Sequence, residues 1–530
     1  MNAFLNILKY GLVVIMVLLA LFIIACGCLV LFPGFSLFGI SYITYDNKQV
    51  ETQISATEAD SPLVQADIIK IDSGIFDVNL DVVDTQKILN GNDFMTCRLS
   101  RNLSGFVVGG EEDKKIALSY NLIEDGETKI LNLVIDQPSR SWLFPTEVAL
   151  NIFVPNTLLQ TKTVEITSTS GTINVGSKPQ YNQDNEVTNT FLNMNTLSIS
   201  NQSGAVNLGC VNLMGDLQIT KDSGDVESYL DLQVKTTISI KSSFGNIKLT
   251  NVGTESSPKD LVLDGIWNSS VKIGTIYGNL VAKNIGGGLF KIAKLIGESS
   301  IKNGFADFYV GEVNAEMTYT ADDGLFELST ITAKLNLTQQ AGTVKIKELG
   351  TTSQLLTHTI STSSAGVTID KLRDSVDVKT QKGDITVNSV PTDTPVSINV
   401  STNDGKVKLL NINGTVTYRC ESGSSSAYVE YSNFVGKNTF LNQSGNIEVV
   451  MPYDKNPAMW LRWETGNTAD IKLFSFESTL KYSSADPRAV IQDGKEYGIA
   501  INEATTSTPE ILQIATRGGH ISVYRQSVAG

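Results

Sequence analysis

A short phrase of alternating residues recurs along this chain and constrains its fold more than any other feature. Around a central glycine, apolar residues stand seven and five positions before it and two and four positions after it. Consecutive copies centre on Gly204, Gly224 and Gly245. An alternation of period two indicates β-strands, because successive side chains point to opposite faces of a strand. Each copy therefore predicts a strand, a tight turn at the glycine and a second strand.

The phrase returns over most of the chain at intervals of about 20 residues. Further copies centre on Gly171, Gly278, Gly324, Gly342, Gly383, Gly405, Gly445 and Gly519, with Ala365 in the place of a glycine in one copy. A strand–turn–strand unit of this size cannot bury its apolar row alone, so repeated units are expected to stack. The sequence predicts an all-β fold, a single-stranded-coil β-solenoid with about 20 residues per coil and β caps.

Stacked coils make a specific prediction about strand pairing. Ile199, Ile219 and Ile240 should form one inward row of parallel neighbours, and Val206 should lie beside Val226. An antiparallel sandwich would instead pair the two strands that flank each glycine as a hairpin.

The N-terminal segment is the second strong feature. No charged residue lies between Lys9 and Asp46, and Gly11–Phe32 is an unbroken apolar run that ends before Pro33. As a helix this run would extend about 33 Å, enough for the roughly 30 Å hydrocarbon core of a bilayer. A signal peptide has a shorter apolar region, so residues 10–33 are predicted to be an uncleaved transmembrane anchor. Lys9 favours a cytoplasmic N-terminus, residues 1–9.

A bacterial lipoprotein is the alternative for the same segment. Residues 23–26, ending in Cys26, are similar to a lipobox, whose cysteine would be acylated. In either case, the remaining chain is expected outside the cytoplasm and attached to a membrane.

The rest of the chain is expected to form four parts. Residues 34–65 are predicted to be a linker because the stretch from about 41 to 65 is polar, and residues 66–160 are predicted to be an N-terminal β region that caps the solenoid. This region contains an imperfect copy of the phrase over 67–80 and a hairpin that turns at Gly126. Residues 161–450 are predicted to be the solenoid repeats, and 451–530 the closing coils and a C-terminal cap, because open solenoid ends need covering.

Charge and the scarcity of catalytic residue types limit the function. The net charge is −14 without a long basic run, which argues against nucleic-acid binding. His358 falls on the inward phase and His520 on the outward phase, so no nucleophile–histidine arrangement is supported. Outside the anchor, Cys97, Cys210 and Cys420 show no metal-ligand spacing, and Cys210 is expected to be buried. We expect no catalytic, metal or cofactor site.

The Ser-Gly turns and the C-terminal phrases carry a family resemblance. Ser203-Gly204, Ser223-Gly224 and Ser444-Gly445, with the segments 445–452 and 518–523, resemble the bacterial "putative-adhesin" family of β-solenoid domains. The resemblance covers roughly residues 66–528 and implies an envelope-anchored protein. It supplies no functional residues.

These observations favour a monomeric, non-enzymatic, adhesin-like cell-surface protein that binds a glycan, the cell wall or a protein. Two alternatives stay open. An envelope sensor or assembly factor would also act by partner binding. A carbohydrate-active β-helix enzyme would need paired carboxylates, but directly after the central glycines only Asp225 and Asp384 are acidic. Asp222 and Asp225 are weak candidates for a calcium site, since no further ligands accompany them.

Overall fold

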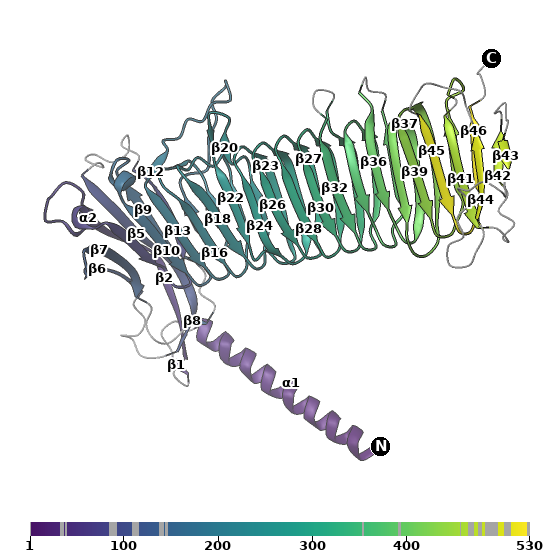
Figure 1. The fold of residues 1–530 in the computed structure, drawn as a ribbon. Helices are drawn as coiled ribbons and strands as arrows, with labels where there is room; N and C mark the ends of the chain where they lie inside the picture. Colours follow the sequence, from purple (N-terminus) through teal and green to yellow (C-terminus); the bar gives the residue numbers. More distant parts are fainter. Residues whose placement is uncertain are drawn as a thin grey trace. The chain divides into compact units, whose positions relative to one another are not determined.

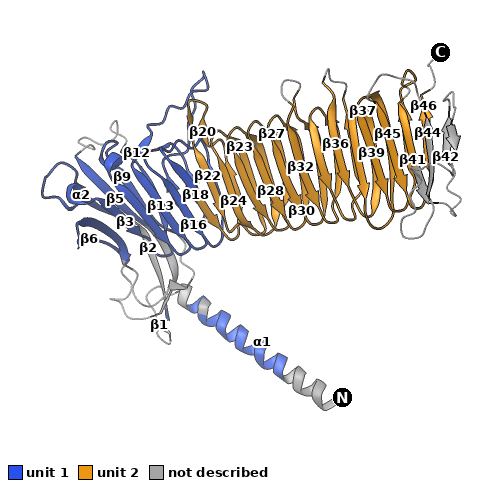
Figure 2. Ribbon diagram, in the orientation of Figure 1, with its two compact units in different colours: residues 1–239 blue, residues 240–530 orange. Residues whose placement is uncertain are grey.

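The structure is a computed structural model in which the chain forms two compact units, residues 1–239 and 240–530 (Figure 2). It describes the following residues: 2–31, 36–37, 40–83, 93–108, 116–136, 142–143, 147–351, 355–390, 394–455, 457–464, 471–474, 480–482, 497–502 and 510–526.

Unit 1 begins with helix α1 (Asn2–Leu31). Within the described part of the chain, no helix combines the length and the apolarity that crossing a membrane requires. The transmembrane anchor therefore stays a prediction, as does the acylation of Cys26, whose side chain lies outside the described residues.

The segment expected to be a linker contains a long strand instead. β1 (Ser36–Leu37) pairs with β2 (Ile40–Ser55), and β2 pairs with β5 (Phe94–Val108) along its whole length, both in antiparallel orientation. Polar composition suggested a linker over 34–65, but the long-range pairing with β5 holds most of this segment in a strand. Ile54 is buried, and so is Leu63 in the short helix α2 (Pro62–Gln65).

The strands of the N-terminal β region pair with the first two strands of the stacked rows in unit 1. β9 (Glu147–Val154) pairs antiparallel with β5 and parallel with β4 (Asp77–Val82), and β8 (Trp142–Leu143) pairs with β5. The expected hairpin is present as β6 (Ala117–Asp125) and β7 (Thr128–Asp136), and β7 pairs in parallel with β3 (Ile68–Asp72).

The remaining strands of unit 1 stack in parallel, as the repeat predicts. Two rows start from β3 and β4, and a 3₁₀ turn, Leu158–Thr161, precedes the first full coil. The first row continues through β10 (Thr163–Ser168), β13 (Thr196–Asn201) and β16 (Leu217–Lys221), and the second through β11 (Ile173–Val175), β14 (Val206–Leu208) and β17 (Val226–Ser228). Ile199 is the register partner of Ile219 and Val206 that of Val226, which confirms these predicted pairings. β12 (Leu192–Met194) and β15 (Val211–Leu213) form a short third side.

Unit 2 is built from two such rows, which we call the first and the second ladder (Figure 1). The first ladder contains β22 (Asp260–Asp264), β24 (Leu280–Ile285), β26 (Ser299–Asn303), β28 (Met317–Ala321), β30 (Leu335–Gln339), β32 (Thr357–Thr362), β34 (Ser375–Lys379), β36 (Val396–Ser401), the end of β37 (Gly405–Cys420) and β39 (Lys437–Asn442). The second contains β19 (Ile247–Leu249), β23 (Ser269–Ile276), β25 (Gly288–Leu295), β27 (Asp307–Val313), β29 (Leu325–Ile331), β31 (Thr343–Leu349), β33 (Gly366–Leu372), β35 (Ile385–Ser389), the start of β37, β38 (Ser425–Phe434) and β40 (Ile447–Met451). Every one of these pairings is parallel, so the structure is a β-solenoid.

The copy of the phrase around Gly278 marks a different corner of the coil from the other copies. Val271 and Ile273 belong to the second ladder and Leu280 to the first, so Gly278 sits at the opposite bend from Gly324. The corners between Gly245 and Gly324 fall instead at Ser269, Gly288 and Ala306. The phrase fits both bends because each coil has two similar strands, so apolar alternation alone cannot distinguish them. The three apolar side chains are nevertheless buried, as predicted.

The stretch between 253 and 258 forms a small antiparallel hairpin of β20 (Gly253–Thr254) and β21 (Ser257–Pro258). Towards the C-terminus, the copy around Gly519 stacks on the copy around Gly445. β45 (Ile511–Thr516) pairs with β39 and β46 (Ile521–Arg525) with β40. The intervening strands are β41 (Ala458–Glu464), β42 (Ile471–Phe474), β43 (Leu480–Tyr482) and β44 (Tyr497–Asn502), which pair with one another or with β45 and β46.

The inward rows end in a polar position at the corner, three residues before the central glycine. Buried polar side chains stand there in many coils: Ser168, Asn201, Lys221, Ser242, Asn303, Gln339, Thr362, Thr380, Thr402, Asn442 and Thr516. Asn201 illustrates their role. Its Oδ1 accepts from the backbone N–H groups of Ser203 (3.1 Å) and Gly204 (2.9 Å), and its Nδ2 donates to the carbonyl of Gly171 (3.0 Å). These side chains satisfy backbone groups that the tight turn leaves unpaired.

We therefore expect Asn201→Ala to lower the free energy of unfolding by about 1–3 kcal/mol, because it leaves buried backbone groups without partners. The neighbouring Gln202 is exposed, so Gln202→Ala should change the stability by less than about 0.5 kcal/mol. Denaturant unfolding of both variants measures the difference, and equal effects would show that the corner bonds contribute nothing specific.

Candidate functional site

A groove crosses the outer face of the second ladder in unit 2. It has a volume of about 640 Å³ and runs over five neighbouring strands, β19, β23, β25, β27 and β29. Because neighbouring strands of a sheet lie about 4.8 Å apart, the groove crosses successive coils at a regular step. An extended ligand lying in it would therefore meet equivalent positions of one coil after another.

Small side chains create the groove. Gly274, Ala293, Gly311 and Ser329 occupy equivalent outward positions on four neighbouring strands and form part of its lining. At two of these positions no side chain fits without disturbing the neighbouring strand. A Cβ on Gly274 would lie 1.9 Å from the carbonyl oxygen of Thr250, and one on Gly311 would lie 2.2 Å from that of Ala293.

Longer side chains line the groove two residues earlier on the same strands. This column, which we call the lysine column, consists of Lys248, Lys272, Lys291, Tyr309 and Glu327, each the register partner of the next. The three lysines are exposed, and the Lys291 ammonium lies 5.4 Å from the centre of the Tyr309 ring. A cation at this distance is attracted by the ring face. The lysine column therefore presents three cations and one carboxylate.

An ion pair lies next to the small residues and adds no net charge to the groove. Lys294 Nζ and a carboxylate oxygen of Glu312 are 2.9 Å apart. The hydrogen bond from Lys294 lowers the pKa of Glu312, so the carboxylate remains charged in neutral solution. The groove's excess positive charge therefore comes from the lysine column.

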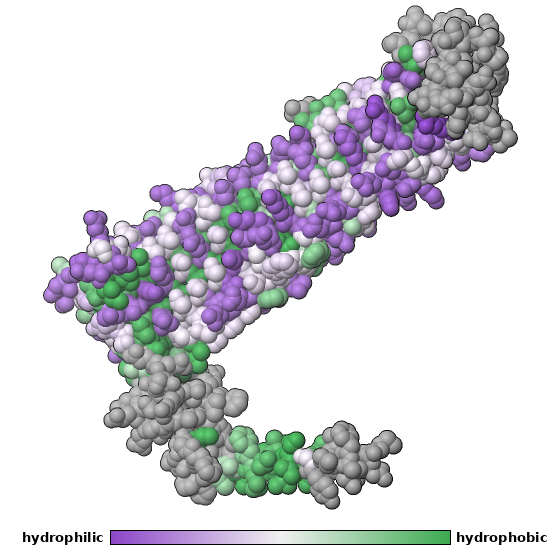
Figure 3. Space-filling view, turned by 60° about the horizontal axis from the view of Figure 1, so that its bottom comes forward, coloured by the Kyte–Doolittle hydropathy of each residue, from purple (hydrophilic) through white to green (hydrophobic). Residues whose placement is uncertain are grey.

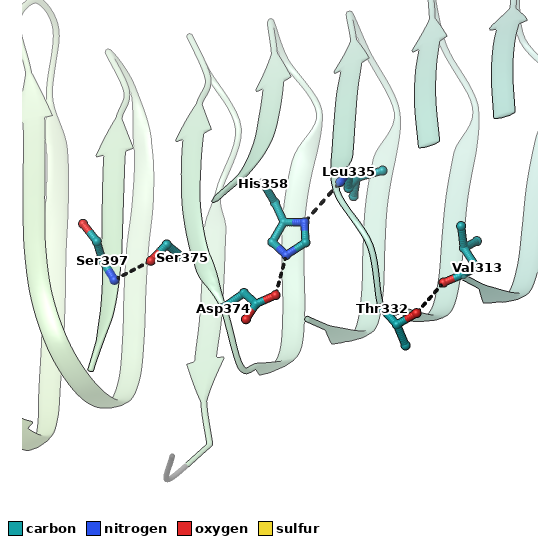
Figure 4. A network of polar contacts seen from close by, with 7 residues as sticks. All are labelled: Val313, Thr332, Leu335, His358, Asp374, Ser375 and Ser397. Carbon is teal, nitrogen blue, oxygen red and sulfur yellow. Dashed lines mark hydrogen bonds and ion pairs between the residues drawn. The ribbon is translucent and has the colours of Figure 1, made fainter. Parts of the chain in front are cut away.

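The buried pair His358 and Asp374 is a different kind of site (Figure 4). Both side chains are fully buried, and His358 Nε2 lies 3.3 Å from Asp374 Oδ2. The backbone N–H of Leu335 donates to His358 Nδ1 at 3.1 Å, so the ring proton is on Nε2 and points to Asp374. No described atom of this pair is open to solvent, so the arrangement fits a structural role, as the inward phase of His358 predicted.

Burial also sets the protonation of the pair. Desolvation lowers the pKa of His358 from 6.5 to about 4 and raises the pKa of Asp374 from 3.8 to about 6. Hydrogen bonds from the backbone N–H groups of Thr351 and Leu356 oppose the rise at Asp374 without cancelling it. At neutral pH, a neutral imidazole therefore donates to an ionised carboxylate.

The two pKa shifts affect stability in opposite directions between pH 4 and 6. The lowered pKa of His358 gives stability that is complete above 6.5 and is lost as the pH falls towards 4. The raised pKa of Asp374 gives stability that is complete below 3.8 and is lost as the pH rises through about 6. In the wild type the two contributions largely cancel.

Asp374→Asn should therefore lose stability more steeply than the wild type as the pH falls from 6.5 to 4, by up to about 1.4 kcal/mol per pH unit. His358→Gln should instead gain stability relative to the wild type as the pH falls over this range, because Asp374 is then the only titrating member of the pair. Thermal unfolding across this pH range measures both slopes. Curves for the variants that run parallel to the wild-type curve would contradict the assigned protonation states.

The other residues considered from the sequence lie apart from one another. His520 is exposed, as predicted, and Cys97, Cys210 and Cys420 are buried and unbridged. Among the described residues, no three His, Cys, Asp or Glu side chains gather into a possible metal site. Asp222 and Asp225 are both exposed, and the structure gives no reason to assign calcium to them.

The groove was not predicted from the sequence. The residues directly after the central glycines do not reveal it, because the lysine column stands three positions after each corner. Lys248 and Glu327 follow recognised copies at Gly245 and Gly324. The positions between them follow Ser269, Gly288 and Ala306, the corners that the phrase around Gly278 obscured. A correct register would have aligned Lys248, Lys272 and Lys291.

The described residues thus define an all-β protein of the β-solenoid class with a groove on one ladder. No protein-family model matches the chain, and no curated protein matches it. Among solved structures, a crystal structure named "putative cell adhesion protein", from Clostridium sporogenes ATCC 15579, is similar over 91% of this chain and 100% of that chain. The two share 7% sequence identity at a TM-score of 0.18, and a similarity at this level carries no argument about function. The family resemblance seen in the sequence stays a prediction.

Proposed function

We propose that this protein is a non-enzymatic, adhesin-like surface protein, in which a membrane anchor carries a solenoid that binds an extended glycan, cell-wall or protein ligand. The groove on the second ladder supports the proposal most directly, because it repeats equivalent positions over five coils. Its lining includes one carboxylate, that of Glu327, whereas glycoside hydrolysis generally uses two. Binding without cleavage is the function that this lining favours.

The anchor is the N-terminal apolar run. The large hydrophobic side chains between Leu12 and Ile24 of α1 are 51–65% exposed, and most of the coloured part of this helix is hydrophobic in Figure 3. An apolar surface of this extent needs a partner of low polarity, and a bilayer supplies one. The proposed orientation has the N-terminus in the cytoplasm and the solenoid outside, and acylation at Cys26 is the alternative attachment.

Fractionation of cells that express the full chain tests the anchor. The chain should stay in the membrane pellet after carbonate washing, and recovery in the soluble fraction would refute the anchor. A truncated form without α1 serves as the comparison and should be recovered in the soluble fraction. It must begin before Ser36, because a later start would remove β1 and shorten β2.

An array of glycans, cell-wall preparations and surface proteins, probed with the detergent-solubilised full chain, tests the binding function. We expect retention on at least one class of extended ligand, and products released from the bound ligand should be absent. Failure to bind any class would refute the proposal, and ligand cleavage would favour an enzyme.

A further inference from the structure

We infer that the groove on the second ladder binds a linear acidic polysaccharide, whose carboxylates lie against Lys272 and Lys291. The inference rests on the proposed function, because it names the ligand class of the same surface. Three observations carry it: the charge of the groove, its repeat and its shape.

The charge of the groove is opposite to that of the chain. The chain carries 55 acidic and 41 basic residues, yet the groove lining contains three lysines and one glutamate. Lys272 and Lys291 occupy adjacent positions of a parallel ladder and repel one another, so their alignment costs stability unless something compensates. Lys291 is partly compensated by the Tyr309 ring, and an anionic ligand would compensate both lysines.

The repeat of the column matches a polymer better than a single anion. Lys248, Lys272 and Lys291 are successive register partners, so their Cα atoms follow one another at about 4.8 Å. The row runs along the direction in which the coils stack, and so does the groove. A chain of sugars that each carry a carboxylate presents a comparable regular row of charges, and several weak ion pairs then act together.

The shape of the groove suits flat rings. Gly274, Ala293 and Gly311 leave space at the level of the backbone, and the half-buried ring of Tyr309 adds an amphipathic aromatic surface. The exposed lysine ammonium groups of the neighbouring column supply polar contacts beside this space. A pyranose ring with apolar faces and polar edges fits this combination.

Titration of the detergent-solubilised full chain with polygalacturonate tests the inference. The fully methyl-esterified polymer is the matched ligand, since it keeps the sugar backbone and removes the charge. We expect binding of polygalacturonate that weakens as salt is added, and binding of the ester weaker by at least about tenfold. Equal binding of the two polymers would overturn the role of charge.

Variants of the lysine column locate the site. Lys272→Thr/Lys291→Thr should weaken binding of polygalacturonate by about tenfold or more. Threonine is suitable because Thr368 and Thr386 occupy the same outward column further along the ladder. The matched control is Lys406→Thr/Lys408→Thr, which removes the same charge from exposed positions of β37, further along the ladder and outside the groove, and should change binding by less than about twofold. Equal losses in the two double variants would overturn the assignment to the groove.

A further variant separates shape from charge. Ala293 is exposed, so Ala293→Trp should fill the groove without unfolding the chain and should weaken binding as strongly as the lysine variant. Circular dichroism confirms that each variant is folded.

Poly-glutamate at the same charge concentration should bind more weakly than polygalacturonate, and stronger binding would indicate an acidic protein as the ligand. If the chain binds neutral glycans or proteins on the array but not polygalacturonate, this inference fails while the proposed function stands.

Discussion

Replacing Leu337 with Asp should lower the free energy of unfolding by more than about 4 kcal/mol, because it places an unpaired carboxylate inside the solenoid. Leu337 is 1% exposed and lies in register between Tyr319 and Ile360 of the neighbouring coils. Neither of these register partners carries a positive charge that would compensate the carboxylate. Denaturant unfolding followed by circular dichroism measures the loss.

The adjacent Thr338 is the matched control, since its side chain points outward from the same strand and is exposed. Thr338→Asp should change the stability by less than about 0.5 kcal/mol. Similar losses in the two variants would mean that the inward and outward phases are wrongly assigned in this coil.

The second large effect is expected at the aromatic cluster in the interior of unit 2. The rings of Phe290 and Phe308 are stacked at a centroid distance of 4.5 Å, and Tyr319 lies 5.5 Å from Phe308 and 4.4 Å from Phe326. Phe308 is fully buried, so Phe308→Ala removes both ring contacts and leaves a cavity. We expect a loss of about 3–5 kcal/mol in the free energy of unfolding.

Phe305 supplies the control for this change. It lies three residues before Phe308 and is 60% exposed, so Phe305→Ala should cost far less than Phe308→Ala. A small loss at both positions would show that the cluster does not stabilise the chain.

The parts of the fold that follow from apolar alternation could be predicted from the sequence. Ile199 pairs with Ile219, and Val206 pairs with Val226, on parallel strands. This register is fixed because one face of each strand must be buried, and a slip by one residue would turn the apolar side chains to the solvent. The buried position of His358 follows from the same phase.

Features that depend on corners or on long-range pairing could not be predicted in the same way. The strands on both sides of a coil alternate similarly, so the pattern around Gly278 did not reveal which bend it marks. β2 pairs with β5 across a large sequence separation, and the polar composition of its segment concealed a strand. Asn201 is on the inward phase, but its polar side chain breaks the apolar pattern, and its bonds to the turn of its own coil and of the neighbouring coil form only in the folded chain.

The groove could not be predicted because it depends on the alignment of the coils between Gly245 and Gly324, whose corners the phrase did not identify. Its charge arises from lysines that are 24 and 19 residues apart in the sequence and become neighbours only in the correct register. Its hollow arises from Gly274, Ala293 and Gly311, which are unremarkable in isolation and matter because they share one column.

The central claim is that consecutive copies of the phrase stack as parallel coils, and a cysteine pair tests it most directly. Thr320 and Thr338 are exposed register partners on β28 and β30, with Cα atoms expected about 4.8 Å apart, within the range that a disulfide bridges. Thr320→Cys/Thr338→Cys should form this bond on mild oxidation, as identified by peptide mapping without reduction. Thr320→Cys/Glu327→Cys, which spans Gly324 within one coil, should not form a bond. The reverse result, bonding across Gly324 and none between Thr320 and Thr338, would mean that the flanking strands pair as a hairpin and would contradict the solenoid.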